Sequence, residues 1–209
     1  QLERILHEMD DFKDLVSECK NPMFGRLTIA TTHTQARYVL PSIIAKFREK
    51  YPDVRLSLLE GAPSQIAQMV LHDHADIAVA TERLAATEGL SSEACYDWTH
   101  QILLPAKHPL VHKAKIKIQD LAQYPLITYD PAFAGRAKID KAFIDAHLRT
   151  DIALEAVDAD VIRTYVELGL GVGILSGMAL ANVDCDKLGL AKRDAGYLFG
   201  KNTTYAAVK

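Results

Sequence analysis

The chain has 209 residues, of which 49% are hydrophobic and 24% are charged, proportions typical of a folded protein with a sizeable core. Its formal net charge of −3 argues against a nucleic-acid-binding surface, for which a basic patch or stripe is expected. No run approaches the roughly 18 apolar residues of a membrane span, and no basic and then apolar signal segment opens the chain.

The three cysteines, Cys19, Cys95 and Cys185, lie far apart and show no spacing typical of a disulfide framework or a zinc site. Of the eight histidines, five have no carboxylate or cysteine at ligand spacing: His33, His100, His108, His112 and His147. The sequence therefore predicts reduced thiols, a cytoplasmic location, and neither a metal nor another cofactor.

The first predicted element is a helix over residues 1–20. Its apolar residues recur at spacings of three and four, charged residues fill the positions between them, and Asn21 and Pro22 end the pattern. The apolar face of such a helix must pack against another protein surface. Either the helix packs on its own domain, or it is the end of a longer connector that pairs with another chain.

Strands and helices then alternate. The predicted strands cover residues 26–32, 54–59 and 75–80, and the predicted helices cover 38–50 and 64–71, the second capped by Ser64. The polar stretch 33–37 lies between the first strand and the first helix. Because strands alternating with helices imply a parallel sheet with right-handed crossovers, this part is predicted to form a β-α-β-α-β unit.

A second α/β unit follows two short predicted strands at 90–98 and 101–104. Its predicted helices cover 118–122, 136–148 and 158–168, the last capped by Asp158, and its predicted strands cover 126–129, 152–157, 172–175 and 197–199. A final strand over 203–209 is expected to return to the first unit.

This pattern predicts an α/β fold of two Rossmann-like lobes in a clamshell of the periplasmic-binding-protein type, with two crossover strands. The crossings are expected near residues 97 and 200. One lobe then comprises 21–96 and 201–209, and the other comprises 97–200. Ligands of such folds bind in the crevice at the carboxyl ends of the strands.

The most informative stretch for a site runs from Thr31 to Tyr38 (TTHTQARY), between a strand end and a helix start. Free N–H groups at a helix start favour an anion, and Thr32, Thr34 and Gln35 add neutral donors. This set is suited to a small oxyanion such as sulfate. The alternative is that Thr34 only caps the helix.

Other candidate residues come from further strand and helix ends. Thr81 closes the strand 75–80 and is expected at the same edge as Thr32. Ala134 and Arg136 lie before a helix of the second lobe and are expected to face the first lobe. There Arg136 either pairs with an acidic ligand or lines the rim.

The glycines between Gly169 and Gly173 do not indicate a nucleotide loop, because a helix precedes them and a strand follows. They are predicted to end that helix and start that strand. The sequence contains no GxSxG, HExxH or Walker motif, so it gives no positive indication of an enzyme.

Several strings of residues resemble those of a known family. The string TTHTQARY, followed by Leu40 and Pro41 and by FREKYP at 47–52, resembles the start of the effector domain of LysR-type transcriptional regulators. TTHTQARY and DADVI at 158–162 are similar to the CysB subgroup in particular. Further matches are SQIA at 64–67, ADIAVATE at 75–82, HPL at 108–110 and GLGVG at 169–173.

The resemblance implies a regulator of sulfur assimilation and cysteine biosynthesis that works as a homodimer or homotetramer. A DNA-binding winged helix-turn-helix would be missing from this chain, and residues 1–20 would be the end of its linker helix. The implied effectors are O-acetylserine or N-acetylserine, with sulfate or thiosulfate in or near the cleft.

The anion contacts of the subgroup correspond to Thr32, Thr34, Gln35 and Thr81. Ala134 departs from the pattern, because many members have threonine there, and one donor of the second lobe is lost. The alternative hypothesis is an oxyanion-binding protein of a transport system, which would share the fold. The TTHTQARY string and the amphipathic first helix favour the regulator.

Overall fold

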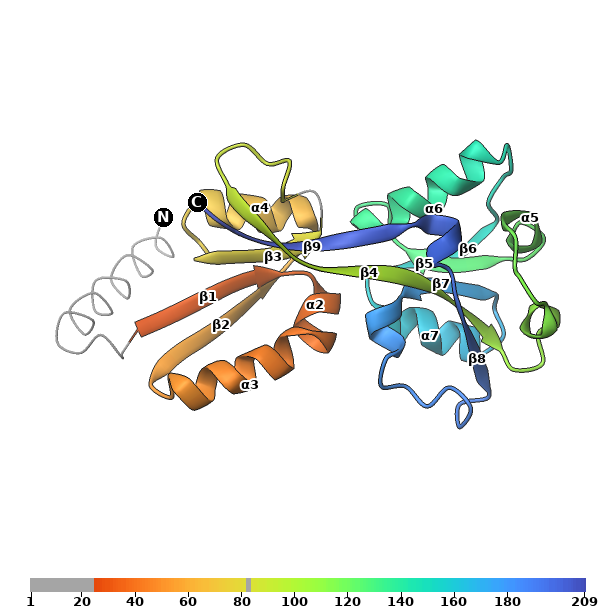
Figure 1. The fold of residues 1–209 in the computed structure, drawn as a ribbon, viewed down its shortest axis with the longest axis horizontal. Helices are drawn as coiled ribbons and strands as arrows, with labels where there is room; N and C mark the ends of the chain where they lie inside the picture. Colours follow the sequence, from red (N-terminus) through yellow and green to blue (C-terminus); the bar gives the residue numbers. More distant parts are fainter. Residues whose placement is uncertain (1–24, 82–83) are drawn as a thin grey trace.

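Three parallel strands form the centre of the first lobe in the computed structural model, which describes residues 25–81 and 84–209. They are β1 (Gly25–Thr31), β2 (Val54–Glu60) and β3 (Ile77–Thr81). The helices that connect them are α2 (His33–Tyr38), α3 (Leu40–Lys50) and α4 (Pro63–Leu71). Figure 1 shows α3 and α4 on opposite sides of these strands. The predicted first helix over 1–20 lies outside the described residues.

Helix α4 covers its side of the sheet with a buried apolar face. Ile66 and Val70 pack against Ala30, Ala78 and Ala80. The small alanine side chains allow the helix to approach the strands closely, and burying each large aliphatic side chain contributes about 1.5–3 kcal/mol. This packing fixes the carboxyl ends of β1 and β3, where the candidate threonines lie.

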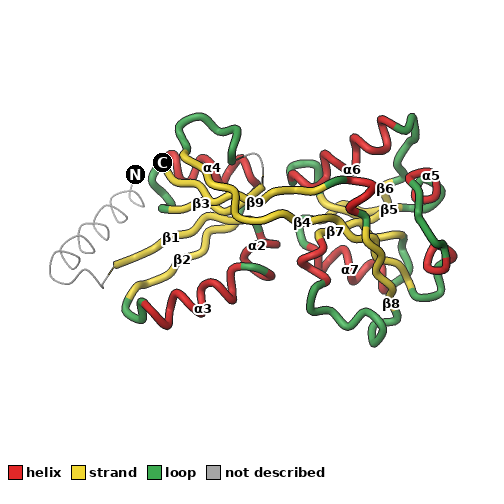
Figure 2. The backbone as a smooth tube through the Cα atoms, in the orientation of Figure 1, coloured by secondary structure: helices red, strands yellow, loops and turns green. Residues whose placement is uncertain are grey.

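Two long antiparallel strands join the lobes. They are β4 (Ser91–Pro105) and β9 (Lys201–Val208), and Figure 2 shows both running from one lobe to the other. The prediction of two separate strands at 90–98 and 101–104 was wrong. The polar residues Thr99 and His100 interrupt the apolar pattern, but Thr99 still pairs with β9 and His100 pairs with Ser176, so the strand continues through them.

The second lobe is built on parallel strands with helices on both faces. Its strands are β5 (Leu126–Tyr129), β6 (Ile152–Ala156), β7 (Val172–Ser176) and β8 (Leu190–Asp194). Its helices and 3-10 turns are η1 (Pro109–His112), α5 (Ile118–Leu121), α6 (Ala134–Asp145), α7 (Ala159–Glu167), η2 (Gly177–Leu180) and α8 (Gly196–Phe199).

Buried residues of β5 and β7 point to both faces of the second lobe, as expected for parallel strands covered on two sides. Leu126 and Ile174 pack on the side of α6, whereas Ile127 and Leu175 pack on the side of α7. Within the described ranges, the strands form one sheet in the order β2-β1-β3-β9-β4-β7-β5-β6, with β8 paired to β4.

Several local predictions differ from the structure. The polar stretch 33–37 lies in helix α2, and 197–199 lies in helix α8 and not in a strand. Helix α4 begins at Pro63, so Ser64 is not its cap. The cap of α7 is confirmed, because the Asp158 side chain accepts a hydrogen bond from the Asp160 backbone N–H at 2.7 Å.

The glycines after α7 end that helix and start β7, as predicted. Gly169 has a φ of 78°, a conformation that glycine adopts without steric cost. At Gly171, a Cβ atom would lie 2.4 Å from the carbonyl oxygen of Pro125, so the chains approach closely there. A helix precedes these glycines and a strand follows, the reverse of a nucleotide-binding loop.

No helix in the described part of the chain combines the length and the apolar character that crossing a membrane would need.

Candidate functional site

A cavity of about 40 Å³ lies where the two lobes meet. This volume is enough for about three water-sized groups. Among the described residues that line it, none is charged. They are Thr32, Thr34, Gln35, Pro63 and Thr81 of the first lobe, Trp98 of the crossing strand, and Tyr129, Phe133, Gly135 and Met178 of the second lobe.

Two of these residues present buried donors that have no partner. The Thr81 side chain is 8% exposed, and its Oγ1 forms no hydrogen bond with any described residue. The same holds for Nε1 of Trp98. A buried donor without a partner costs about 1–3 kcal/mol. Two such donors around one cavity indicate that a polar ligand completes their bonding.

Gln35 is held in place by residues of both crossing strands. Its Nε2 donates to Thr204 Oγ1 at 3.1 Å, and its Oε1 accepts from the Tyr96 hydroxyl. Burial raises the pKa of Tyr96, and its hydrogen bonds with Thr204 and Gln35 oppose that rise. One amide N–H of Gln35 therefore stays available on a side chain that cannot easily turn.

Thr32 and Thr34 lie at the start of α2. Thr32 occupies the N-cap position without a side-chain capping bond, and Thr34 lies inside the first turn, so Thr34 does not cap the helix. Helix α2 has only six residues, so its dipole is small. An anion at its start would be bound mainly by hydrogen bonds from the hydroxyl groups.

Tyr129 forms the wall opposite Thr34. Burial raises the pKa of this tyrosine, whereas hydrogen bonds with Ser176 and Thr34 lower it. Its hydroxyl donates to Ser176 Oγ at 3.2 Å and accepts from the Ser176 N–H at the same distance. Thr34 therefore contacts both the cavity and the second lobe.

Arg136 lies away from the cavity. It is 6% exposed; its Nε donates to Asp140 at 2.7 Å, and its Nη1 donates to Glu155 and to the Tyr129 carbonyl, each at 2.7 Å. These hydrogen bonds connect α6 to β5 and β6. Arg136 therefore does not line the rim of the cavity. Ala134 is the first residue of α6, and its side chain lies outside what the structure describes.

The structure thus brings together four of the six candidate residues, Thr32, Thr34, Gln35 and Thr81. The sequence pattern gave no prediction of Trp98, Tyr129 or Met178 as site residues. Tyr129 ends β5 just as Thr81 ends β3, so its position at a strand end was a usable indication. Trp98 ends the predicted strand 90–98, beside the crossing expected near residue 97, but it was not considered as a site residue.

Gly135 allows α6 to approach the crossing strand. A Cβ atom there would lie 2.9 Å from Nε2 of His100 and 3.2 Å from Cη2 of Trp98. We expect Gly135→Ala to lower the free energy of unfolding by about 1 kcal/mol, because the clash outweighs the helix preference for alanine. Urea unfolding measures this change, and an unaltered midpoint would contradict the close approach.

No group of three or more His, Cys, Asp or Glu side chains that could hold a metal ion occurs within residues 25–81 and 84–209.

The chain matches the LysR substrate binding domain family over residues 20–195. It belongs to this family. This LysR domain is 51% identical to the HTH-type transcriptional regulator CysB of Burkholderia cenocepacia over 208 residues, 100% of this chain and 66% of that protein. It is 42% identical to the regulator cbl of Escherichia coli over 207 residues, 99% of this chain and 65% of that protein.

This LysR domain spans about two thirds of the length of these curated relatives. In three dimensions it is similar to the crystal structure of the cofactor-binding domain of the Cbl transcriptional regulator. The TM-score is 0.84 at 42% identity, covering 89% of this chain and 81% of that chain. The predicted family and the two-lobed fold class are confirmed.

The relatives are named as transcriptional regulators and not as enzymes, in agreement with the lack of catalytic motifs in the sequence. The alternative of a transport protein finds no support among them.

Proposed function

We propose that this LysR domain senses a small oxyanion in the cavity between its lobes, as the effector-binding part of a CysB-like transcriptional regulator. One observation carries the proposal. The Thr81 hydroxyl is buried at a cavity that no charged residue lines among those described, and it has no partner among them either. An anion that accepts this hydrogen bond would satisfy it.

The donors favour a fully ionised, compact anion. Neutral hydroxyl, amide and indole groups bind an anion through hydrogen bonds alone, and charged acceptors make such bonds roughly twice as strong. Sulfate and thiosulfate fit this description. O-acetylserine and N-acetylserine are larger than a cavity of about 40 Å³, so in this proposal they bind only when the lobes separate.

In this proposal, Ala134 affects the affinity of the cavity for sulfate. With alanine where many relatives of the CysB subgroup have threonine, the second lobe has one donor fewer. A hydrogen bond to a charged group contributes about 1.5–3 kcal/mol, so Trp98 or a water molecule must compensate, or sulfate is held less tightly. Arg136 in this proposal supports the wall of the second lobe through Tyr129 and does not contact the ligand.

The regulatory role follows from the two-lobed form. We place the lobe boundaries near residues 97 and 200, and we assign residues 1–20 to the end of a linker helix. An effector that prefers one arrangement of the lobes would shift the population of that arrangement. In a cytoplasmic homodimer or homotetramer this would change how an attached DNA-binding domain meets DNA, for the control of sulfur assimilation and cysteine biosynthesis.

Calorimetric titration with sulfate, thiosulfate, O-acetylserine and N-acetylserine tests the proposal. We expect saturable binding of at least one of the two inorganic anions. The acetylserines should show a larger heat-capacity change, because lobe movement alters the buried apolar area. If none of the four compounds binds at millimolar concentration, the proposed sensor function is wrong.

A further inference from the structure

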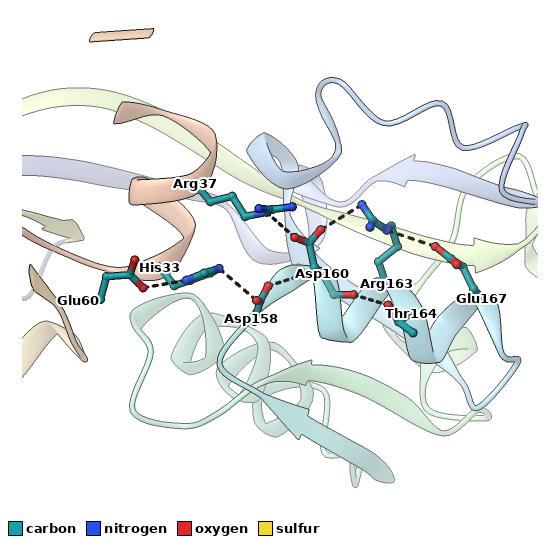
Figure 3. A network of polar contacts seen from close by, with 8 residues as sticks. All are labelled: His33, Arg37, Glu60, Asp158, Asp160, Arg163, Thr164 and Glu167. Carbon is teal, nitrogen blue, oxygen red and sulfur yellow. Dashed lines mark hydrogen bonds and ion pairs between the residues drawn. The ribbon is translucent and has the colours of Figure 1, made fainter. Parts of the chain in front are cut away.

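Helix α2 presents two different sets of side chains. Thr32, Thr34 and Gln35 line the cavity. His33 and Arg37 are four residues apart and therefore share the other face of the helix. Figure 3 shows this second pair pointing away from the first lobe, toward the start of α7 in the second lobe.

The His33 ring lies between two carboxylates from different lobes. Its Nδ1 is 2.8 Å from Glu60 Oε2, at the end of β2, and its Nε2 is 3.1 Å from Asp158 Oδ2, at the cap of α7. Nε2 is buried, and its approach to Asp158 is that of an ion pair without the alignment of a hydrogen bond. The imidazole therefore bridges the two lobes beside the cavity.

This geometry suits a protonated ring, because a carboxylate faces each of its nitrogens. A carboxylate only accepts hydrogen bonds, and a neutral imidazole has a single N–H. With both nitrogens facing carboxylates, only the imidazolium offers a donor to each. In the neutral ring one nitrogen lone pair would face a carboxylate oxygen. Histidine is also the side chain that ordinarily exchanges its proton between pH 5 and 8.

The remaining charges near the bridge come from α2 and α7. Arg37 forms an ion pair with Asp160, and Arg163 joins Asp160 at 3.1 Å and Glu167 at 3.2 Å (Figure 3). Arginine keeps its charge at all physiological pH values. Among the described residues, the charged groups around His33 are thus Glu60 from β2, Asp158 from the cap of α7, Asp160 from α7, and Arg37 from its own helix.

We propose that His33 is a pH-dependent latch between the lobes. The imidazolium holds the start of α7 against α2 and keeps the cavity closed, whereas the neutral ring releases Asp158. As pH rises and His33 loses its proton, closure and anion affinity both fall. The effect on affinity rests on the proposed anion-sensing function, and the effect on closure does not.

The only tryptophan of the chain, Trp98, lines the cavity and reports on closure without any ligand. We expect its emission in the wild-type protein to change between pH 5.5 and 8.5 with a single transition. His33→Gln should abolish the transition. Asp158→Asn should also abolish it, because asparagine caps a helix as well as aspartate does but lacks the charge.

Two features distinguish the protonation of His33 from that of other histidines in this measurement. His112→Gln is the matched control, since His112 is an exposed histidine in the second lobe, and the transition should persist in it. His100 stacks near Trp98, but burial lowers its pKa to about 4, below the range of the titration. A transition that is absent from the wild type, or unchanged in His33→Gln, would overturn the latch.

Sulfate affinity provides the second measurement. Between pH 6 and 8.5 we expect wild-type affinity to fall about two- to fivefold, the size expected for a partly exposed ion pair, and His33→Gln to show no such fall. Equal pH dependence in the two proteins would contradict the latch. Absence of sulfate binding at every pH would instead overturn the proposed function, and the emission of Trp98 would still decide on the latch.

Discussion

Replacing Thr81 with valine should weaken sulfate binding by about ten- to a hundredfold and leave the free energy of unfolding unchanged or slightly higher. Valine has nearly the same shape but no hydroxyl group. In the ligand-free protein that hydroxyl has no partner among the described residues, so its removal costs no hydrogen bond. In the anion complex the loss is that of a bond to a charged group, about 1.5–3 kcal/mol.

Thr128→Val is the matched control. Thr128 is fully buried in β5, and its hydroxyl donates to the Ile174 carbonyl at 2.8 Å. Its loss should lower the free energy of unfolding by about 1 kcal/mol and leave sulfate affinity unchanged. Calorimetry and urea unfolding of both variants make the comparison. Wild-type sulfate affinity in Thr81→Val would remove this hydroxyl from the proposed site.

The free energy of unfolding should fall by about 3 kcal/mol as pH drops from 6.5 to 4, through His100 alone. The pKa of His100 is lowered from 6.5 to about 4, mainly by burial and also by the charge of Lys138, while a hydrogen bond with the Gly135 backbone opposes the shift in part. Below pH 6.5 the unfolded chain binds a proton that the folded protein does not take up until about pH 4. Each unit of difference corresponds to about 1.4 kcal/mol.

The direction of this pH dependence follows from the difference between the pKa values of His100 in the folded and unfolded states. The contribution of His100 is fully present above pH 6.5, because neither state is then protonated, and it is lost as pH falls toward 4. Urea unfolding between pH 4 and 7.5, in the wild type and in His100→Gln, isolates the contribution from that of acidic residues. Parallel stability curves for the two proteins would show that His100 does not control this range.

The sequence predicted the parallel strands well, since each is a short apolar run bounded by turn residues. It failed where tertiary pairing overrides the local pattern. Strand β8, with the sequence LAKRD, alternates with charged residues and was not predicted; its ladder with β4 holds it in place. The apolar run 197–199 suggested a strand, but it forms a helical turn that packs Phe199 into the core of the second lobe.

Four of the ten described residues that line the cavity were predicted from the sequence, for a physical reason. The carboxyl ends of parallel strands meet at one edge, so Thr32 and Thr81 were expected to lie together. The opposite wall of the cavity depends on how β4 and β9 orient the second lobe, which the sequence pattern does not give. Trp98 and Tyr129 were therefore not predicted as site residues. Arg136 was expected to face solvent or ligand, but Glu155, on a different strand, makes its burial tolerable.

The position of β9 has a consequence for the newly made chain. This strand is inserted between β3 and β4, and Gln35 is bonded to Thr204 across a sequence separation of 169 residues. Until residues 201–208 have left the ribosome, β3 keeps an open edge with unpaired backbone groups, a template for association with other chains. The first lobe to be synthesised is thus the last to be completed, and chaperones have a defined interval in which to protect it.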